Sequence, residues 1–205
     1  MKQSLLITFI FLTIATFGQD FPFIKDFKSG TIIQTNGTSK TGFIKWNTNQ
    51  NERLRFKEAG SDEVTKYSPL ELVGFTVDTL YYKSLFDIEV YAENYPLLNK
   101  TSVLKETFGQ VLHSGKVNIY CVVAHGYEPM SGAGIFLNFL FERVTSDKKE
   151  YAAYPVGTRM KNKRYDAAKE KLYTFFADYP SVIDKIKTYK QYDDFFDVIK
   201  MVKGL

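Results

Sequence analysis

The chain of 205 residues is 44% hydrophobic and 16% aromatic, with 18 Phe and 14 Tyr. This composition excludes a disordered or low-complexity chain and favours a folded, β-rich protein, because aromatic side chains suit pleated sheets and bury large areas. The formal net charge is only +4, and the single cysteine excludes an intramolecular disulfide. That residue, Cys121, lies in an apolar run, so we expect a buried small hydrophobe; a redox-sensing thiol is the alternative.

Residues 1–19 have the pattern of a cleavable secretory signal peptide. Lys2 precedes an apolar run over residues 5–15, and the small residue Gly18 follows at a suitable cleavage point. A membrane-spanning helix needs about 20 consecutive apolar residues, and this shorter run is interrupted by threonines, which disfavours an uncleaved anchor. We therefore expect an exported protein, periplasmic or secreted, with no transmembrane span after cleavage. A peripheral place at the outer membrane stays open.

Residues 20–160 are predicted to form a β-rich domain. Residues 31–35 and 41–47 favour two strands around the turn dipeptide Asn36-Gly37. Residues 53–57 alternate between polar and apolar side chains, as a half-buried strand does, and a single helical turn is predicted soon after, at residues 68–71. Further strands are predicted at residues 72–78, 80–85, 117–123, 135–144 and 150–156.

Residues 101–112 are predicted to form a helix inserted in this domain. The apolar residues recur at spacings of four, three and one, which makes a stripe on a helix. These residues are Leu104, Phe108, Val111 and Leu112. Residues 124–134, which include the Gly-rich stretch 131–134, are predicted to be a loop between strands and the best candidate for a mobile mouth.

Residues 161–205 are predicted to form short amphipathic helices that pack on the sheet. Apolar residues recur every three or four positions from Tyr165, Pro180 marks a break, and Asp193 or Asp194 is placed to cap a last helix. The predicted fold class is therefore α+β. It has an N-terminal and central antiparallel β-sheet with one inserted helix and a C-terminal helical set. The sheet is predicted to be a meander, and its closure into a barrel stays open.

The sequence contains no recognisable catalytic, cofactor or metal pattern. His113 and His125 match no zinc-binding spacing, and we place His113 at a helix end and His125 in a loop. Asp87 and Glu89 alternate on the wet face of a strand, with Glu93 close by, and acid/base catalysis would require two carboxylates with divergent pKa values in a cleft. We therefore predict no catalytic residue, no metal and no cofactor.

The strongest local charge feature is a basic stretch near the C-terminus. Residues 143–205 carry 14 Lys and Arg against 9 Asp and Glu, whereas residues 20–142 carry 12 against 14. In an exported protein this asymmetry favours a lipid headgroup or an acidic glycan over nucleic acid as the partner, with a solvated helix surface as the alternative. The candidate anion-binding residues are Arg159, Lys161, Lys163, Arg164, Lys169 and Lys171.

Several segments resemble uncharacterised exported proteins of Bacteroidota. They are Phe17-Gly18-Gln19, Gly30-Thr31-Ile32-Ile33, Thr41-Gly42-Phe43-Ile44-Lys45, the stretch 67–75, Gly115-Lys116-Val117-Asn118-Ile119-Tyr120 and Phe176-Ala177-Asp178-Tyr179-Pro180. The resemblance covers most of the mature chain. It implies export and the architecture of one self-contained protein. It does not imply any activity, cofactor or catalytic residue.

These observations favour an exported, envelope-associated and noncatalytic binding or interaction module. The expected partner is an envelope protein, a lipid headgroup or an acidic glycan. The alternative is a small hydrolase or transferase, which needs a cleft with convergent polar groups that the sequence does not identify.

Overall fold

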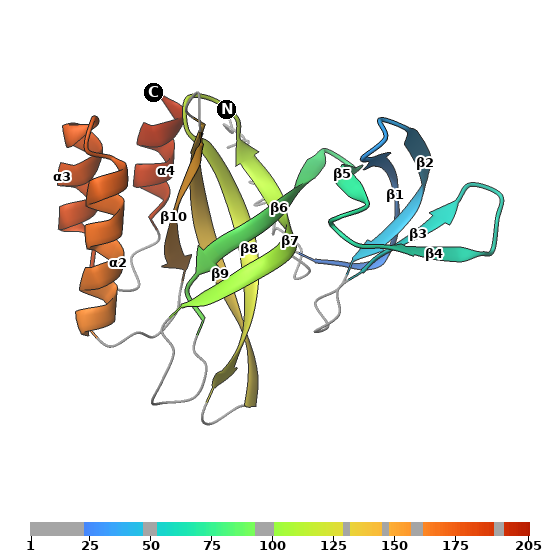
Figure 1. Cartoon of the computed structure of the whole chain (residues 1–205), viewed down its shortest axis with the longest axis horizontal. Coiled ribbons are helices and arrows are strands. Elements are labelled where there is room, and N and C mark those ends of the chain that lie inside the picture. Colours follow the sequence, from blue (N-terminus) through green and yellow to red (C-terminus); the bar gives the residue numbers. More distant parts are fainter. Residues whose placement is uncertain are drawn as a thin grey trace, which may run out of the picture.

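A computed structural model describes residues 23–46, 53–92, 101–128, 132–144, 148–156, 162–190 and 195–205. The predicted signal peptide, residues 1–19, lies outside these ranges. Within them the chain forms ten strands in one antiparallel sheet and three helices (Figure 1). The antiparallel sheet and the C-terminal helices confirm the coarse α+β prediction.

The bounds of the elements follow the chain. The strands are β1 (Ile24–Gln34), β2 (Ser39–Trp46), β3 (Leu54–Glu58), β4 (Val64–Tyr67), β5 (Leu72–Val77), β6 (Leu80–Val90), β7 (Ser102–His113), β8 (Asn118–Glu128), β9 (Gly132–Val144) and β10 (Lys149–Val156). The helices are α2 (Asn162–Phe175), α3 (Pro180–Thr188) and α4 (Phe196–Lys203).

The strand order is β10-β9-β8-β7-β6-β5-β1-β2-β3-β4. The sheet is a meander from β5 to β10, and β1 joins its two parts by pairing with β2 on one side and β5 on the other. The predicted hairpin between β1 and β2 is confirmed, and Gly37 adopts the positive φ of +85° that its turn requires. The end strands β4 and β10 are not hydrogen-bonded to each other, so the described sheet does not close into a barrel.

The predicted inserted helix over residues 101–112 is wrong. This segment is strand β7, which pairs with β6 and β8. Leu104 and Phe108 are four residues apart, and a spacing of four places side chains on one face of a strand as well as on one face of a helix. Pairing with two neighbouring strands decides between the alternatives, and the sequence window does not contain that information.

The turn at residues 68–71 is also not helical. Ser68 and Glu71 face each other in a reciprocal contact: the backbone N–H of Glu71 donates to the Ser68 carbonyl at 3.1 Å, and the backbone N–H of Ser68 donates to the Glu71 carboxylate at 2.8 Å. The residues that resemble the start of a helix therefore form a single hydrogen-bonded turn, which leads into β5.

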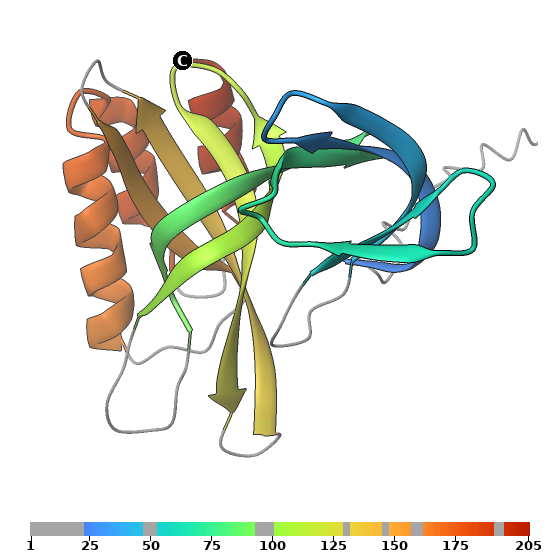
Figure 2. The same cartoon turned by 45° about the vertical axis from the view of Figure 1, so that its right-hand side comes forward.

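Two regions of the sheet bury separate cores. The N-terminal half, defined as β1–β5 with the first part of β6 and the adjoining part of β7, buries an aromatic-rich cluster around Trp46. Trp46 meets Phe75, Tyr82 and Phe108 edge-on, with ring centroids 5.4–6.0 Å apart. Strands β6 and β7 run through both halves (Figure 2), since Tyr82 belongs to this core and Leu85 to the next.

The C-terminal half, defined as the rest of β6 and β7 with β8–β10 and the helices, buries apolar side chains on both faces of its sheet. The helices cover one face (Figure 1), where Phe141 packs against Phe175, Phe176 and Phe195. On the other face, residues such as Leu140 pack against the second part of β6. No helix in the described ranges combines the length and the apolar character that crossing a membrane requires.

The helix boundaries follow the predicted break. Pro180 occupies the first turn of α3, where its missing N–H costs no helical hydrogen bond. The N-cap of α4 is Phe195, which adopts a left-handed conformation and buries its ring. Asp193 and Asp194, predicted to cap this helix, lie outside the described residues.

Candidate functional site

The central polar feature of the C-terminal half is the carboxylate of Glu142 on β9. Strand alternation directs the neighbouring Phe141 toward the helices and Glu142 toward the opposite face, so a charged side chain lies in the sheet interior. The register places Asn118 of β8 and Tyr151 of β10 directly opposite Glu142, one on each side. Tyr120 lies two residues further along β8 on the same face. Three strands therefore deliver polar side chains to one point.

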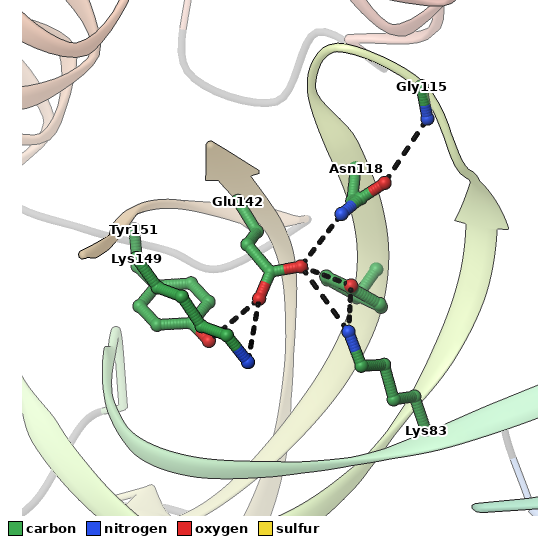
Figure 3. A network of polar contacts seen from close by, with 7 residues as sticks. Lys83, Gly115, Asn118, Glu142, Lys149 and Tyr151 are labelled. Carbon is green, nitrogen blue, oxygen red and sulfur yellow. Dashed lines mark hydrogen bonds and ion pairs between the residues drawn. The ribbon is translucent and has the colours of Figure 1, made fainter. Parts of the chain in front are cut away.

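This carboxylate accepts three hydrogen bonds and lies near two ammonium groups (Figure 3). Oε2 accepts hydrogen bonds from the Asn118 amide at 2.8 Å and from the Tyr120 hydroxyl at 2.5 Å, and Oε1 accepts one from the Tyr151 hydroxyl at 2.9 Å. The ammonium groups of Lys83 and Lys149 lie 3.6 and 3.7 Å from the carboxylate. The Glu142 side chain is 0% exposed, whereas those of Lys83 and Lys149 are 32% and 54% exposed. We call these six residues the Glu142 network.

The electrostatics of the Glu142 network hold the carboxylate in its ionised form. Burial alone would raise the pKa of Glu142, but the hydrogen bonds from Tyr120, Asn118 and Tyr151, together with the charge of Lys83, outweigh burial and lower the pKa to about 2. Burial first, and then the hydrogen bond to this carboxylate, raise the pKa values of Tyr120 and Tyr151 above their ordinary range. The pKa of the carboxylate is lowered and those of the two tyrosines are raised, so all three are shifted away from neutral pH, which disfavours an acid/base role for them.

A second buried contact fixes the end of β6 over β9. Asn138 is fully buried, and its amide donates to the Tyr91 carbonyl at 3.0 Å while its Oδ1 accepts from the Tyr91 backbone N–H at 2.9 Å. The Asn138 side chain thereby satisfies both backbone groups of Tyr91, just beyond the end of β6, as a neighbouring strand would. Asn138 and Glu142 both lie on the interior face of β9 and tie it to neighbouring segments.

The outer face of the N-terminal half carries a different charge arrangement. Lys45 on β2 is directly opposite Arg55 on β3, and Arg55 is directly opposite Lys66 on the end strand β4. Their sequence neighbours Ile44, Leu54 and Tyr67 are buried, so alternation places all three cations on the outer face. We call Lys45, Arg55 and Lys66 the cationic row.

The cationic row lacks counter-ions within the part of the chain that the structure describes. Other lysines near it are paired: Lys57 lies 2.6 Å from Asp62, and Lys40 lies 3.8 Å from Glu58. No ion pair joins a described carboxylate to Lys45, Arg55 or Lys66. Like charges directly opposite one another across strands are destabilising, so this arrangement has a cost that no ion pair within the described residues offsets.

The basic residues predicted from the sequence are only partly described. Arg159 and Lys161 lie outside the described ranges, and Lys163 and Arg164 fall on the first turn of α2, where only the backbone is described. The Lys169 ammonium donates to the Tyr189 carbonyl at 3.0 Å and lies over the Tyr165 ring, so it ties α2 to the end of α3. Lys171 pairs with Glu89 at 2.8 Å. Positions 169 and 171 are two apart on a helix and do not share a face.

The other candidates resolve as follows. Cys121 is buried as predicted, and burial raises the pKa of its thiol to about 12, which disfavours a redox-sensing role. Asp87 and Glu89 are both exposed and pair with different lysines, Lys105 and Lys171, so they are not a catalytic pair. Glu93 lies outside the described residues.

Both histidine placements are wrong. His113 ends strand β7 instead of a helix, and His125 lies within β8, opposite Ile135 of β9, instead of in a loop. The predicted loop 124–134 is correspondingly shortened: β8 extends to Glu128 and β9 begins at Gly132, so most of the segment is a β-hairpin. No three His, Cys, Asp or Glu side chains of the described ranges gather closely enough to hold a metal.

Sequence reasoning missed both the Glu142 network and the cationic row. A signal for the network was present, since Glu142 directly follows the apolar run 139–141 in a strand-like segment, and an acid in such a run implies buried partners. The cationic row has no local signal, because its three residues come from three strands and meet only through their register.

No protein-family model matches this chain, and neither does any curated protein or solved structure. The resemblance to exported proteins of Bacteroidota therefore stays a prediction.

Proposed function

We propose that the protein is an exported, envelope-associated and noncatalytic binding module that recognises an anionic partner through the cationic row. The observation that carries this proposal is the direct opposition of Lys45, Arg55 and Lys66 without a counter-ion. An anionic partner laid along the row would supply the missing negative charge and remove the repulsion at the same time.

The Glu142 network supports a noncatalytic role. A general acid or base needs a pKa near the working pH, whereas the pKa of Glu142 is about 2 and the tyrosine pKa values are raised. The oxygens of the carboxylate are already occupied by three hydrogen bonds and two lysines. This arrangement suits a structural anchor, and it gives the alternative hydrolase or transferase no reactive group.

Export and envelope association rest on the sequence. The charged start, apolar run and small residue of segment 1–19 favour secretion, and export brings the row into contact with the acidic proteins, lipids and glycans of an envelope. The C-terminal basic residues, Arg159 to Lys171, remain a second candidate surface for the same class of partner.

Retention on immobilised polyglutamate tests the cationic row. The chain without residues 1–19 is compared with the triple variant Lys45→Gln, Arg55→Gln, Lys66→Gln, and with a matched triple variant Lys116→Gln, Lys200→Gln, Lys203→Gln. Both variants lose the same charge, and the control lysines are exposed on other parts of the fold. We expect the row variant alone to elute at clearly lower salt, because its charges act together.

Two results would contradict this proposal. Equal elution of both triple variants would show that net charge, and not the row, determines retention. Loss of retention in an Arg159→Gln, Lys161→Gln, Lys163→Gln variant with the row intact would instead locate the binding surface at the C-terminal basic stretch.

A further inference from the structure

We infer that the anionic partner is an extended acidic peptide that adds as a strand to the free edge of β4. This inference rests on the proposed function and names the partner of the same cationic row. Strand β4 is an edge strand of the sheet and lies at the end opposite the helices (Figure 1). It is hydrogen-bonded to β3 alone among the described strands. Its other edge offers backbone N–H and C=O groups to a further strand.

The direction of the cationic row points to that edge. Lys45, Arg55 and Lys66 follow one another across β2, β3 and β4, and neighbouring strands are about 4.8 Å apart. An added strand continues this line by one position, so its residue opposite Lys66 occupies the next place in the row. An acidic side chain there contacts Lys66 directly, and Arg55 is long enough to approach it from the next strand.

The same face of β4 sets a second requirement two residues away. Val64 shares the outer face with Lys66 and is 42% exposed. In an antiparallel addition, which continues the pattern of the whole sheet, the residue two positions after the acid lies opposite Val64. The preferred segment therefore has the form acidic, any residue, apolar.

The turn between β3 and β4 argues against a broad anionic surface as the occupant. Glu58, Asp62 and Glu63 are exposed at this end of β3 and β4; Glu58 and Asp62 pair with Lys40 and Lys57, and no described cation pairs with Glu63. A lipid bilayer or a polysaccharide sheet that covered the end of the molecule would bring its negative charges against these carboxylates. A single extended segment places its acid at Lys66 and needs no further negative charge near the turn.

A second copy of the same chain is also disfavoured. Antiparallel pairing of two β4 strands would bring two Lys66 side chains close together, and their like charges would repel each other. A lysine on an edge strand is a common device against self-association, and here it also selects a partner of opposite charge.

The test measures the fluorescence anisotropy of a fluorescein-labelled peptide, Thr-Thr-Glu-Thr-Val-Thr-Thr, as the full mature chain is added. Two further peptides carry backbone N-methyl groups, one at Glu and Val and the other at the two threonines that follow these residues. In an added strand, successive N–H groups point alternately to β4 and to solvent, so N-methylation weakens binding at least about tenfold in one peptide and little in the other. Replacing Glu by Lys in the peptide weakens it similarly.

Hydrogen exchange supplies the direct structural readout. We expect the unmodified peptide to increase protection within β4, because alternate backbone groups of Val64–Tyr67 gain partners. A peptide held only by charge would leave that protection unchanged, and this result would overturn strand addition.

The outcomes separate the two proposals. Equal binding of both N-methylated peptides, with loss of binding in the triple row variant, overturns strand addition and leaves anion recognition by the row intact. Equal binding to the row variant and the native chain overturns the proposed function itself. Row-dependent binding to anionic vesicles or to polygalacturonate that exceeds binding to the peptide assigns the surface to a lipid or a glycan and also overturns strand addition.

Discussion

The interior of the C-terminal half and the outer face of the N-terminal half use charge in opposite ways. In the interior, one carboxylate, Glu142, is met by three hydrogen-bond donors and by Lys83 and Lys149. On the outer face, three cations lie side by side and no described carboxylate pairs with them. A compensated buried charge holds strands together, whereas an uncompensated exposed row costs stability within the fold and gains it only with a partner.

The cores of the two halves also differ in how much polar and charged material they bury. The core of the N-terminal half is built from apolar and aromatic side chains around Trp46. The corresponding face of the C-terminal half combines Leu85, Ile88 and Leu140 with the buried polar groups of Asn138 and Glu142. The buried polar side chains nearest the Trp46 core, Ser84 and Gln110, are uncharged. We therefore expect the strongest effects of polar mutations in the C-terminal half.

The largest effect is expected for Glu142→Gln. Breaking a buried ion pair by removing one partner typically costs 3–5 kcal/mol, and we expect a loss of about 3 kcal/mol because Lys83 and Lys149 reach water. Urea unfolding measures this loss. The matched control is Glu106→Gln, an exposed position on β7, which should change stability by less than about 0.5 kcal/mol. Equal effects of the two substitutions would contradict the structural role of the Glu142 network.

Two spectroscopic signals then show whether the halves unfold together. Trp46 is the single tryptophan and reports on the N-terminal half by fluorescence, whereas the described helices, which dominate the circular dichroism near 222 nm, all lie in the C-terminal half. Because β6 and β7 contribute to both cores, we expect both signals to shift to the same lower urea concentration in Glu142→Gln. A shift of the helical signal alone would show that the halves are separate folding units.

Acid should remove the same stabilisation in the native chain. The pKa of Glu142 falls from 4.5 to about 2 on folding, so its contribution is complete above about pH 4.5 and is lost as the pH falls through 2. The shift corresponds to a free energy on the order of 3 kcal/mol. The difference in unfolding free energy between the native chain and Glu142→Gln should therefore shrink between pH 5 and pH 2.5. A constant difference across this range would show that ionisation of Glu142 is not what stabilises the fold.

Asn138→Ala should have the next largest effect. The substitution leaves the backbone N–H and carbonyl of Tyr91 buried without their partners, which costs about 1–3 kcal/mol. Thermal unfolding measures the loss, and Glu170→Ala at an exposed position of α2 serves as the control. A change no greater than that of the control would mean that the end of β6 is held by its apolar contacts alone.

The sequence predicted local features of both regions and missed the contacts that distinguish them. The alternation of Leu54 and Phe56, the Asn36-Gly37 turn and the break at Pro180 are local signals, and the structure confirms them. Strand β7 was predicted as a helix because a spacing of four fits both structures. The Glu142 network and the cationic row each need the register of three strands, which depends on long-range pairing and not on any window of sequence.

The smallest effect, and the one of opposite sign, is expected for neutralisation of the cationic row. Replacing Lys45, Arg55 and Lys66 by Gln removes repulsion between directly opposed cations and should raise the unfolding free energy by up to about 1 kcal/mol at low salt. Screening weakens interactions between exposed charges, so the gain should largely vanish at about 1 M salt. Urea unfolding of the native chain and the triple variant at both salt concentrations measures it. Destabilisation by the triple variant would show that these cations have partners within the fold, and the row would then belong with the Glu142 network as a compensated arrangement.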